Sequence, residues 1–183
     1  MRYRTIVADP PWEYAAMPIG GDAPGRFGAT RPLGYPTMSI GDITALPVSE
    51  MSDRDAVLWL WTTNRWLPHT FAIVSAWGFE YRQTIVWGKN NPMPVGSVAP
   101  SAAEFLLVAR RGKPSVGWSF PSSVIVTPRP PNRRHSTKPD CFMDYIEACS
   151  PEPRLEMFAR RQRIGWDTWG NEALNHVPQL DAS

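Results

Sequence analysis

The four residues Asp9-Pro10-Pro11-Trp12 combine a carboxylate, two prolines and a large aromatic ring directly after a short apolar segment. The two prolines fix φ and lack N–H donors, so the carbonyl groups here are acceptors on a stiff backbone. The Asp9 carboxylate is a further acceptor, and Trp12 offers a flat surface for stacking. A ligand that satisfies all three is planar with an exocyclic amino group, as adenine and cytosine are. The alternative is a rigid turn with a tryptophan in the core, and the four residues alone leave both open.

Polar residues that can bind a zwitterionic ligand with hydroxyl groups gather in the C-terminal third of the chain. Lys138 precedes a predicted helix, Arg160 follows a predicted strand, and Asn171 and Glu172 follow a second turn. Taken singly, Lys138 and Arg160 are typical of solvated charges, and Asn171 is typical of a turn. Together with Asp9 they favour a binding site.

Short apolar segments alternate with amphipathic ones over most of the chain, which favours a doubly wound α/β sheet. Strands are predicted at residues 3–8, 56–61, 81–87, 104–109, 123–126 and 155–158. Helices are predicted at residues 40–46, 67–77 and 139–149, and loops rich in Gly and Pro at 13–36 and 88–99. Ser39 can cap the first helix and Gly78 can end the second. In open α/β sheets, ligands bind at the carboxyl ends of strands, and Asp9 follows the first strand.

The 183 residues suggest a single domain, which we expect to span residues 1–175 with a short tail at 176–183. The hydrophobic content of 43% excludes a fully disordered chain, and a net charge of +2 is too balanced to indicate nucleic acid by itself. No apolar run reaches the ~18 residues of a membrane helix, and no signal peptide is recognisable. We therefore expect a cytoplasmic protein that makes no membrane contact.

Neither a disulfide nor a metal site is expected. Cys141 and Cys149 lie in one predicted helix, where their spacing corresponds to about 12 Å, too far for a disulfide bond. The histidines are scattered, and no His/Cys pair has the spacing of zinc ligands.

Six motifs occur in the order found in the MT-A family of N(6)-adenine methyltransferases, which this chain resembles from about Arg4 to Glu172. They are Asp9-Pro10-Pro11-Trp12, Tyr35-Pro36-Thr37-Met38-Ser39, Trp59-Leu60-Trp61, Ser136-Thr137-Lys138-Pro139-Asp140, Leu155-Glu156-Met157-Phe158-Ala159-Arg160 and Trp169-Gly170-Asn171-Glu172. The chain is especially similar to compact bacterial and phage members. The resemblance implies a Rossmann-like methyltransferase that uses S-adenosyl-L-methionine, with a mostly parallel sheet and a permuted motif order. A permuted order explains why no G-x-G-x-x-G follows the first strand.

The resemblance also implies roles for individual residues. The catalytic motif is formed by Asp9, Pro10, Pro11 and Trp12. Contacts to the cofactor are implied for Asp9, Lys138, Arg160, Gln162, Asn171 and Glu172. Contacts to the target base are expected from Trp12, Tyr35 and Glu104, and contacts to the substrate strand from Arg26 and Arg31. Gln162 and Glu172 stand where the eukaryotic enzymes have His and Gln, and the loop from Glu13 to Tyr35 is longer than theirs.

Basic and aromatic residues can provide a track for a phosphate backbone, with DNA expected rather than RNA. They are Arg26, Arg31, Arg110, Arg111, Lys113, Arg129, Arg133 and Arg134, with Phe27 and Trp118 available for stacking. The alternative is that these are ordinary solvated side chains. Because the chain has no separate target-recognition domain, we expect low sequence specificity, a homodimer or a partner subunit.

Three other functions remain open from the sequence. The first is the same reaction on RNA adenines. The second is a catalytically silent subunit that binds nucleic acid or serves as a scaffold, which the intact Asp-Pro-Pro-Trp motif disfavours. The third is methylation of a small molecule, which the open basic loops disfavour.

Overall fold

The computed structural model describes residues 1–13, 36–93, 99–130 and 137–169. Its strands are β1 (Tyr3–Ala8), β2 (Ser52–Thr62), β3 (Glu80–Met93), β4 (Ser101–Arg111), β5 (Val124–Val126), β6 (Arg154–Met157) and β7 (Asp167–Trp169). Its helices are α1 (Ile40–Thr44), α2 (Val48–Met51), α3 (Leu67–Ala76) and α4 (Asp140–Cys149).

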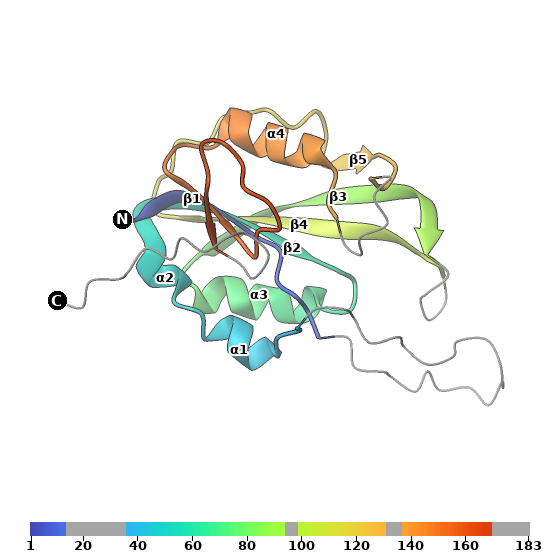
Figure 1. Ribbon diagram of the computed structural model, residues 1–183, viewed down its shortest axis with the longest axis horizontal. Helices are drawn as coiled ribbons and strands as arrows, with labels where there is room; N and C mark the ends of the chain where they lie inside the picture. The colour runs from blue at the N-terminus through green and yellow to red at the C-terminus, as the bar shows by residue number, and fades with distance from the viewer. Residues whose placement is uncertain (14–35, 94–98, 131–136, 170–183) are drawn as a thin grey trace.

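The strands of the described residues form one sheet in the order β5-β3-β4-β2-β1-β6-β7. β4 runs antiparallel to both of its neighbours, whereas the other neighbouring strands pair in parallel. Helix α4 covers one face of the sheet, and α1, α2 and α3 lie on the other (Figure 1). This arrangement confirms the predicted doubly wound, mostly parallel α/β fold.

Alternate residues of the central strands supply two apolar cores, one on each face of the sheet. In β1, Ile6 packs with the cluster that includes Ile43 of α1, whereas Val7 packs with the cluster that includes Phe142 of α4. Successive side chains of a strand point to opposite faces, so a strand covered on both sides is apolar throughout. The apolar run at 56–61 is continuous because this part of β2 is covered on both faces of the sheet.

The local signals at the helix ends act as predicted. Ser39 precedes α1, and its Oγ accepts a hydrogen bond of 3.1 Å from the Asp42 N–H. Gly78 has a φ of +80° directly after α3, a conformation that glycine adopts at no steric cost.

Two regions differ from the prediction. β3 continues to Met93, through residues whose Gly, Asn and Pro content predicted a loop, because pairing with β4 extends from Glu80↔Arg110 to Met93↔Ser101. Inter-strand hydrogen bonds outweigh the local turn preference here. The sequence also gave no sign of α2 or of β7, which have four and three residues and are too short for a periodic pattern.

Cys141 and Cys149 are both free thiols. None of the helices in the described parts of the chain combines the length and apolar character needed to cross a bilayer. Residues 14–35 of the predicted loop at 13–36, and the predicted tail at 176–183, lie outside the described residues.

Candidate active site

Asp9 directly follows β1, which lies between β2 and β6 in the sheet. Pro10 after it is buried, and the Trp12 N–H donates a 2.8 Å hydrogen bond to the Pro10 carbonyl, which closes a tight turn around Pro11. The Pro11 carbonyl in turn accepts a 2.9 Å hydrogen bond from the Met38 N–H. The first two sequence motifs are therefore fastened to one another, and the position of the Asp9 carboxyl is fixed by the backbone on both sides.

Four charged side chains form a continuous cluster beside this turn, which we call the buried charge cluster: Asp9, Lys138, Glu104 and Lys89. Lys138 Nζ lies 2.6 Å from Asp9 Oδ2 and 3.2 Å from Glu104 Oε2. Glu104 Oε1 accepts a hydrogen bond of 2.5 Å from Lys89 Nζ. The side chains of Lys89, Glu104 and Lys138 are 8%, 11% and 12% exposed, and that of Asp9 is 25% exposed. The two cations and two anions alternate, so their charges balance away from water.

The sheet register and two tryptophans hold this cluster in place. Trp87 of β3 pairs with Glu104 of β4, and Lys89 follows two residues later on the same face of β3. Lys89 Nζ lies 4.8 Å from the centre of the Trp87 ring, and Lys138 Nζ lies 5.2 Å from the centre of the Trp61 ring. Both are within the range of a cation–π attraction, which is stronger for desolvated ammonium groups.

The cluster sets different protonation preferences for its two carboxyl groups. Burial alone would raise the pKa of Glu104, but the ammonium groups of Lys138 and Lys89 outweigh it and hold that pKa below its ordinary value. Burial raises the pKa of Asp9, and the neighbouring Glu104 adds to the rise, against the opposing pull of Lys138 and Arg160. Burial alone would lower the pKa of Lys138, but Asp9 and Glu104 raise it. The cluster thus disfavours the charged form of the Asp9 carboxyl and favours the charged form of the Glu104 carboxyl.

The turn after β6 brings Arg160 to the same end of the sheet. Phe158 has a φ of +62°, and the Trp169 carbonyl accepts hydrogen bonds from the Phe158 N–H and, at 3.2 Å, from the Ala159 N–H. A positive φ at a bulky residue is an uncommon, costly conformation, so the two backbone bonds to β7 hold the chain in it. Arg160 follows half-buried and interacts electrostatically with Asp9.

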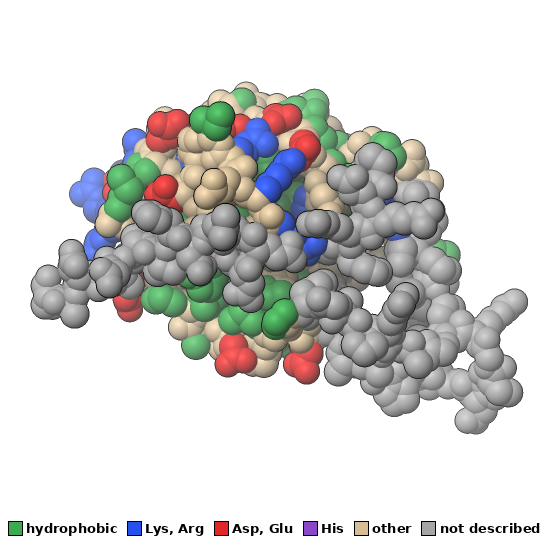
Figure 2. All heavy atoms as spheres, viewed as in Figure 1, with side chains coloured by type: hydrophobic (Ala, Val, Ile, Leu, Met, Phe, Trp, Pro, Cys, Tyr) green, Lys and Arg blue, Asp and Glu red, His purple; other side chains and the backbone are tan. Residues whose placement is uncertain are grey.

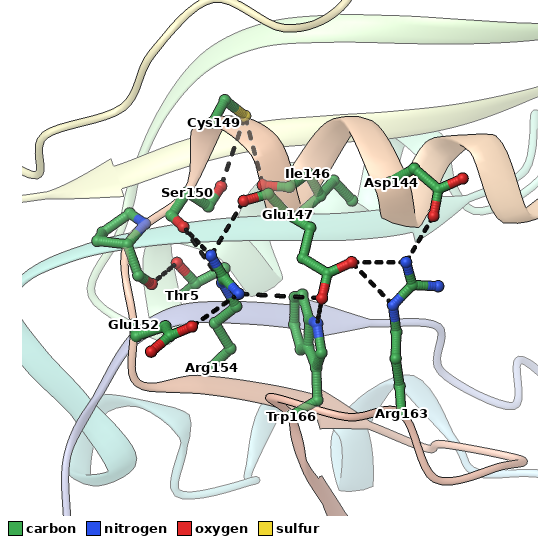
Figure 3. A network of polar contacts seen from close by, with 11 residues as sticks. Thr5, Asp144, Ile146, Glu147, Cys149, Ser150, Glu152, Arg154, Arg163 and Trp166 are labelled. Carbon is green, nitrogen blue, oxygen red and sulfur yellow. Dashed lines mark hydrogen bonds and ion pairs between the residues drawn. The ribbon is translucent and has the colours of Figure 1, made fainter.

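A second set of polar contacts, the α4 network, fastens this segment to α4 (Figure 3). Arg163 Nη2 lies 2.5 Å from both Asp144 Oδ1 and Glu147 Oε2, and Arg163 Nε donates to the same Glu147 oxygen at 3.0 Å. The Trp166 indole N–H and Arg154 approach the other Glu147 oxygen at 3.1 Å and 3.9 Å. Both ends of the segment from Arg154 to Trp166 are thereby held against one carboxylate of α4.

Trp12 is only 4% exposed and stacks on Trp66, with ring centres 6.0 Å apart and an angle of 18° between the planes. Its indole Nε1 is buried and has no hydrogen-bond partner among the described residues. The ring belongs to the core on the α1 and α3 face of the sheet. Its predicted stacking against a base stays a prediction.

The structure thus gathers Asp9, Glu104, Lys138 and Arg160 at one end of the sheet, while Gln162 is exposed on the turn that follows. Five predicted site residues lie outside the described residues: Arg26, Arg31, Tyr35, Asn171 and Glu172.

The residues of the predicted phosphate track do not lie at one end of the sheet, and Phe27, Arg133 and Arg134 lie outside the described residues. β4 runs antiparallel, so Arg111 pairs with Ala56 near the start of β2, whereas Phe105, beside Glu104, pairs with Thr62 at its end. Six residues of strand separate the two positions by about 20 Å. Arg110, Arg111 and Lys113 therefore lie near the opposite end of the central strands from Asp9. Trp118 is fully exposed and follows Gly117, which donates to the Cys149 carbonyl at the end of α4.

Sequence reasoning missed two charged residues near Asp9. Lys89 was assigned to a loop, although its position two residues after Trp87 would have placed it on the same face of an extended strand. Glu156 lies on β6 opposite Val7 of β1, and burial raises its pKa to about 7, with Asp9 adding to the rise. A single acidic residue inside the apolar run 155–158 was the available signal for it.

Open α/β sheets of the Rossmann-like kind bind their ligands outside the carboxyl ends of the strands, which is where the buried charge cluster lies. The sequence profile of the MT-A70 family matches residues 3–172, and the chain belongs to this family. This membership confirms the predicted family, fold and enzyme class, an adenine methyltransferase.

Individual relatives support the same assignment. The chain is similar to "Type II methyltransferase M.MunI" from Mycoplasma sp., with 31% identity over 93% of this chain and 78% of that protein. It is 29% identical to "Probable N(6)-adenosine-methyltransferase MT-A70-like" from Oryza sativa subsp. japonica over 98% of this chain and 24% of that protein. It is 27% identical to human "N(6)-adenosine-methyltransferase catalytic subunit METTL3" over 98% of this chain and 30% of that protein. The chain thus spans most of the bacterial relative and less than a third of these two eukaryotic ones.

Proposed function

We propose that this protein transfers a methyl group from S-adenosylmethionine to the N6 amino group of adenine in DNA, with Asp9 as its catalytic residue. The observation that carries the proposal is the Asp9 carboxyl, fixed beside the Pro10 carbonyl and 2.6 Å from Lys138 at the end of β1. The polymer is chosen because the relative of which this chain spans 78% is a type II methyltransferase, whereas the relatives named for adenosine are far longer.

The residues around Asp9 fit a zwitterionic cofactor. Lys138 and Arg160 can bind its carboxylate, and Asp9 can bind its ammonium group. The predicted contacts of Gln162, Asn171 and Glu172 belong to the same proposal. When bound, S-adenosylmethionine supplies a methyl group on a positively charged sulfur.

The amino nitrogen of adenine is a poor nucleophile because its lone pair is delocalised into the ring. Hydrogen bonds from its two N–H groups to the Asp9 carboxylate and the Pro10 carbonyl would favour tetrahedral geometry and free that lone pair. The Pro10 carbonyl already accepts the Trp12 N–H, but a carbonyl oxygen has a second lone pair. A carboxylate is too weak a base to deprotonate the free amine, so Asp9 accepts the proton late, once methylation has made the nitrogen acidic.

The proposal also assigns roles to further residues. Tyr35, Glu104 and Trp12 contact the target base, and Arg26 and Arg31 contact the strand, as the resemblance and the charge pattern suggest. A homodimer or a partner subunit completes the binding surface for the substrate. The free thiols of Cys141 and Cys149 suit a reducing compartment such as the cytoplasm.

Methyl transfer from labelled S-adenosylmethionine tests the proposal directly. Matched single-stranded DNA, duplex DNA and RNA are offered, and the nucleosides are analysed by mass spectrometry. We expect N(6)-methyladenine in DNA, and a loss of about 100-fold or more in Asp9→Asn, the range typical of a lost proton acceptor. Asp42→Asn, an exposed carboxyl on α1, is the matched control and keeps full activity.

Two results would contradict it. Methylation of RNA alone would replace the substrate, and cofactor binding lost together with transfer in Asp9→Asn would make Asp9 chiefly a cofactor ligand. Calorimetry of cofactor binding to the wild type and the variant separates the latter case from a catalytic role.

A further inference from the structure

Lys89 contacts Glu104 in the buried charge cluster but not Asp9. Its Nζ lies 2.5 Å from Glu104 Oε1, and its side chain is 8% exposed. A lysine buried to this extent needs a charged partner. The next residue on the strand, Asn90, is exposed, so a lysine at that position would have faced solvent instead.

We propose that Lys89 is a positioning residue for Asp9: by holding one oxygen of Glu104, it leaves Lys138 bound to the Asp9 carboxylate. The proposal deepens the proposed function and rests on the catalytic role of Asp9 stated there.

The geometry gives Lys138 two competing acceptors. It lies 2.6 Å from Asp9 Oδ2 and 3.2 Å from Glu104 Oε2, so the shorter contact is to Asp9. The second oxygen of Glu104 is taken by Lys89. Each carboxylate of the cluster thus has an ammonium group at hydrogen-bond distance, and Glu104 has two.

Removal of the Lys89 charge would change this division. Glu104 would then be a buried carboxylate with Lys138 as its ammonium partner in the cluster, and its attraction for Lys138 would no longer be offset. In a site shielded from water such attractions are strong, so Lys138 would move toward Glu104 and away from Asp9. The cluster would carry a net negative charge, and Asp9 would lose its closest cation.

The consequence is a change in the protonation of Asp9 that no general loss of stability would produce. The charged groups that act on Asp9 are Lys138 before α4, Glu104 on β4, Arg160 after β6 and Glu156 on β6. With Lys138 withdrawn and Glu104 less compensated, the pKa of Asp9 rises further above its ordinary value. The carboxylate form that accepts the amine N–H is then populated only at higher pH.

The variants follow from the contacts. Lys89→Met removes the charge and keeps the apolar stem, and Lys89→Gln keeps a hydrogen-bond donor without charge. Lys89→Arg keeps the charge and serves as the rescue. The matched control is Arg82→Met on the same strand, which removes an ion pair of 3.0 Å to Glu80 at an exposed position.

The first measurement is a carboxyl-carbon NMR titration of the protein labelled at aspartate, with Asp9 assigned by the signal missing from Asp9→Asn. We expect the Asp9 midpoint to rise by about one pH unit or more in Lys89→Met and Lys89→Gln. It should stay near the wild-type value in Lys89→Arg and Arg82→Met. The acid limb of the pH–rate profile of methyl transfer should shift in the same direction and by a similar amount.

An unchanged Asp9 midpoint in a folded Lys89→Gln or Lys89→Met protein overturns the proposal, as does an equal shift in Arg82→Met. The titration requires no turnover, so it is independent of the proposed function. A wild type that methylates no polymer, with the midpoint shifted as expected, overturns the catalytic role and leaves the placement of Asp9 by Lys89 standing.

Discussion

Three carboxyl groups lie within or beside the active site, and each has a different balance of burial and neighbouring charge. Glu104 is held ionised by two lysines, and Asp9 has one close lysine and a raised pKa. Burial raises the pKa of Glu156 to about 7, against the attraction of Arg161 and Arg163. The charge of Glu156 therefore changes with pH near neutrality.

This difference predicts a pH-dependent effect of Glu156→Gln on stability. The folded pKa of about 7 lies above the ordinary 4.5, so between these values the folded state binds more protons than the unfolded state. The free energy of unfolding of the wild type thus falls as the pH rises, by about 2–3 kcal/mol from pH 5 to pH 8 through this group. Glu156→Gln has no titrating carboxyl at this position and lacks this loss. In urea unfolding, the free energy of unfolding of Glu156→Gln relative to the wild type should therefore rise by the same amount from pH 5 to pH 8. Glu152→Gln, at a carboxyl 69% exposed, should leave the slope unchanged, and equal slopes in wild type and Glu156→Gln would contradict the assignment.

Helix α4 and the segment after β6 form the element on which the proposed cofactor contacts depend. On the face shown in Figure 2, basic and acidic side chains lie side by side over this region, in keeping with the pairs of Arg161 with Asp140 and of Arg163 with Asp144 and Glu147. The contacts differ in burial, since Arg163 is 22% exposed and Arg161 is 60% exposed. Solvent therefore screens the pair of Arg163 with Glu147 less than it screens the pair of Arg161 with Asp140.

The α4 network therefore predicts unequal effects of two arginine substitutions. Arg163→Met removes the bonds to Asp144 and Glu147 and should cost about 1–3 kcal/mol of unfolding free energy, because Glu147 is left partly buried without its nearest cation. Arg161→Met should cost less than about 1 kcal/mol, as exposed pairs do. Cofactor affinity, measured by calorimetry on folded protein, should fall in Arg163→Met because Arg160 loses its support. Equal losses of stability in both variants would show that the network does not fasten the segment.

The elements differ in how far the sequence alone predicted them. The buried strands and the longer helices follow from apolar runs and capping residues, so β1, α3 and α4 lie within two residues of their predicted bounds. The continuation of β3 beyond Gly88 depends on hydrogen bonds to β4, a partner distant in sequence, and no local pattern reports it. Lys89 was missed for that reason. Asp9, Lys138 and Arg160 were candidates from their residue types and places in the chain. Glu104 was predicted only through the resemblance to a family, because the proximity of the four arises from four separate elements.

At the scale of the whole molecule, the candidate active site lies at one end of the central strands of the sheet. The buried charge cluster lies at the carboxyl end of β1. Three basic residues lie near the opposite end of the central strands: Arg110, Arg111 and Lys113. These basic residues are thus divided between the two ends of the central strands.

The recessed position of Asp9 predicts that adenine must leave the base stack to react. The Asp9 side chain is 25% exposed and Pro10 is buried, so an amino group that reaches both the carboxylate and the Pro10 carbonyl must enter the surface of the protein. Flipping a paired base costs a few kcal/mol, less where its partner is missing. We therefore expect kcat/KM for an adenine opposite an abasic site to exceed that for the matched duplex by about 10- to 100-fold, with single-stranded DNA comparable to the abasic duplex. An abasic site placed several base pairs away should give no gain, which separates flipping from general loosening of the duplex. Equal kcat/KM for all of these substrates would mean that base extrusion does not limit the reaction, and that the Asp9 site is reached by an adenine still in its stack.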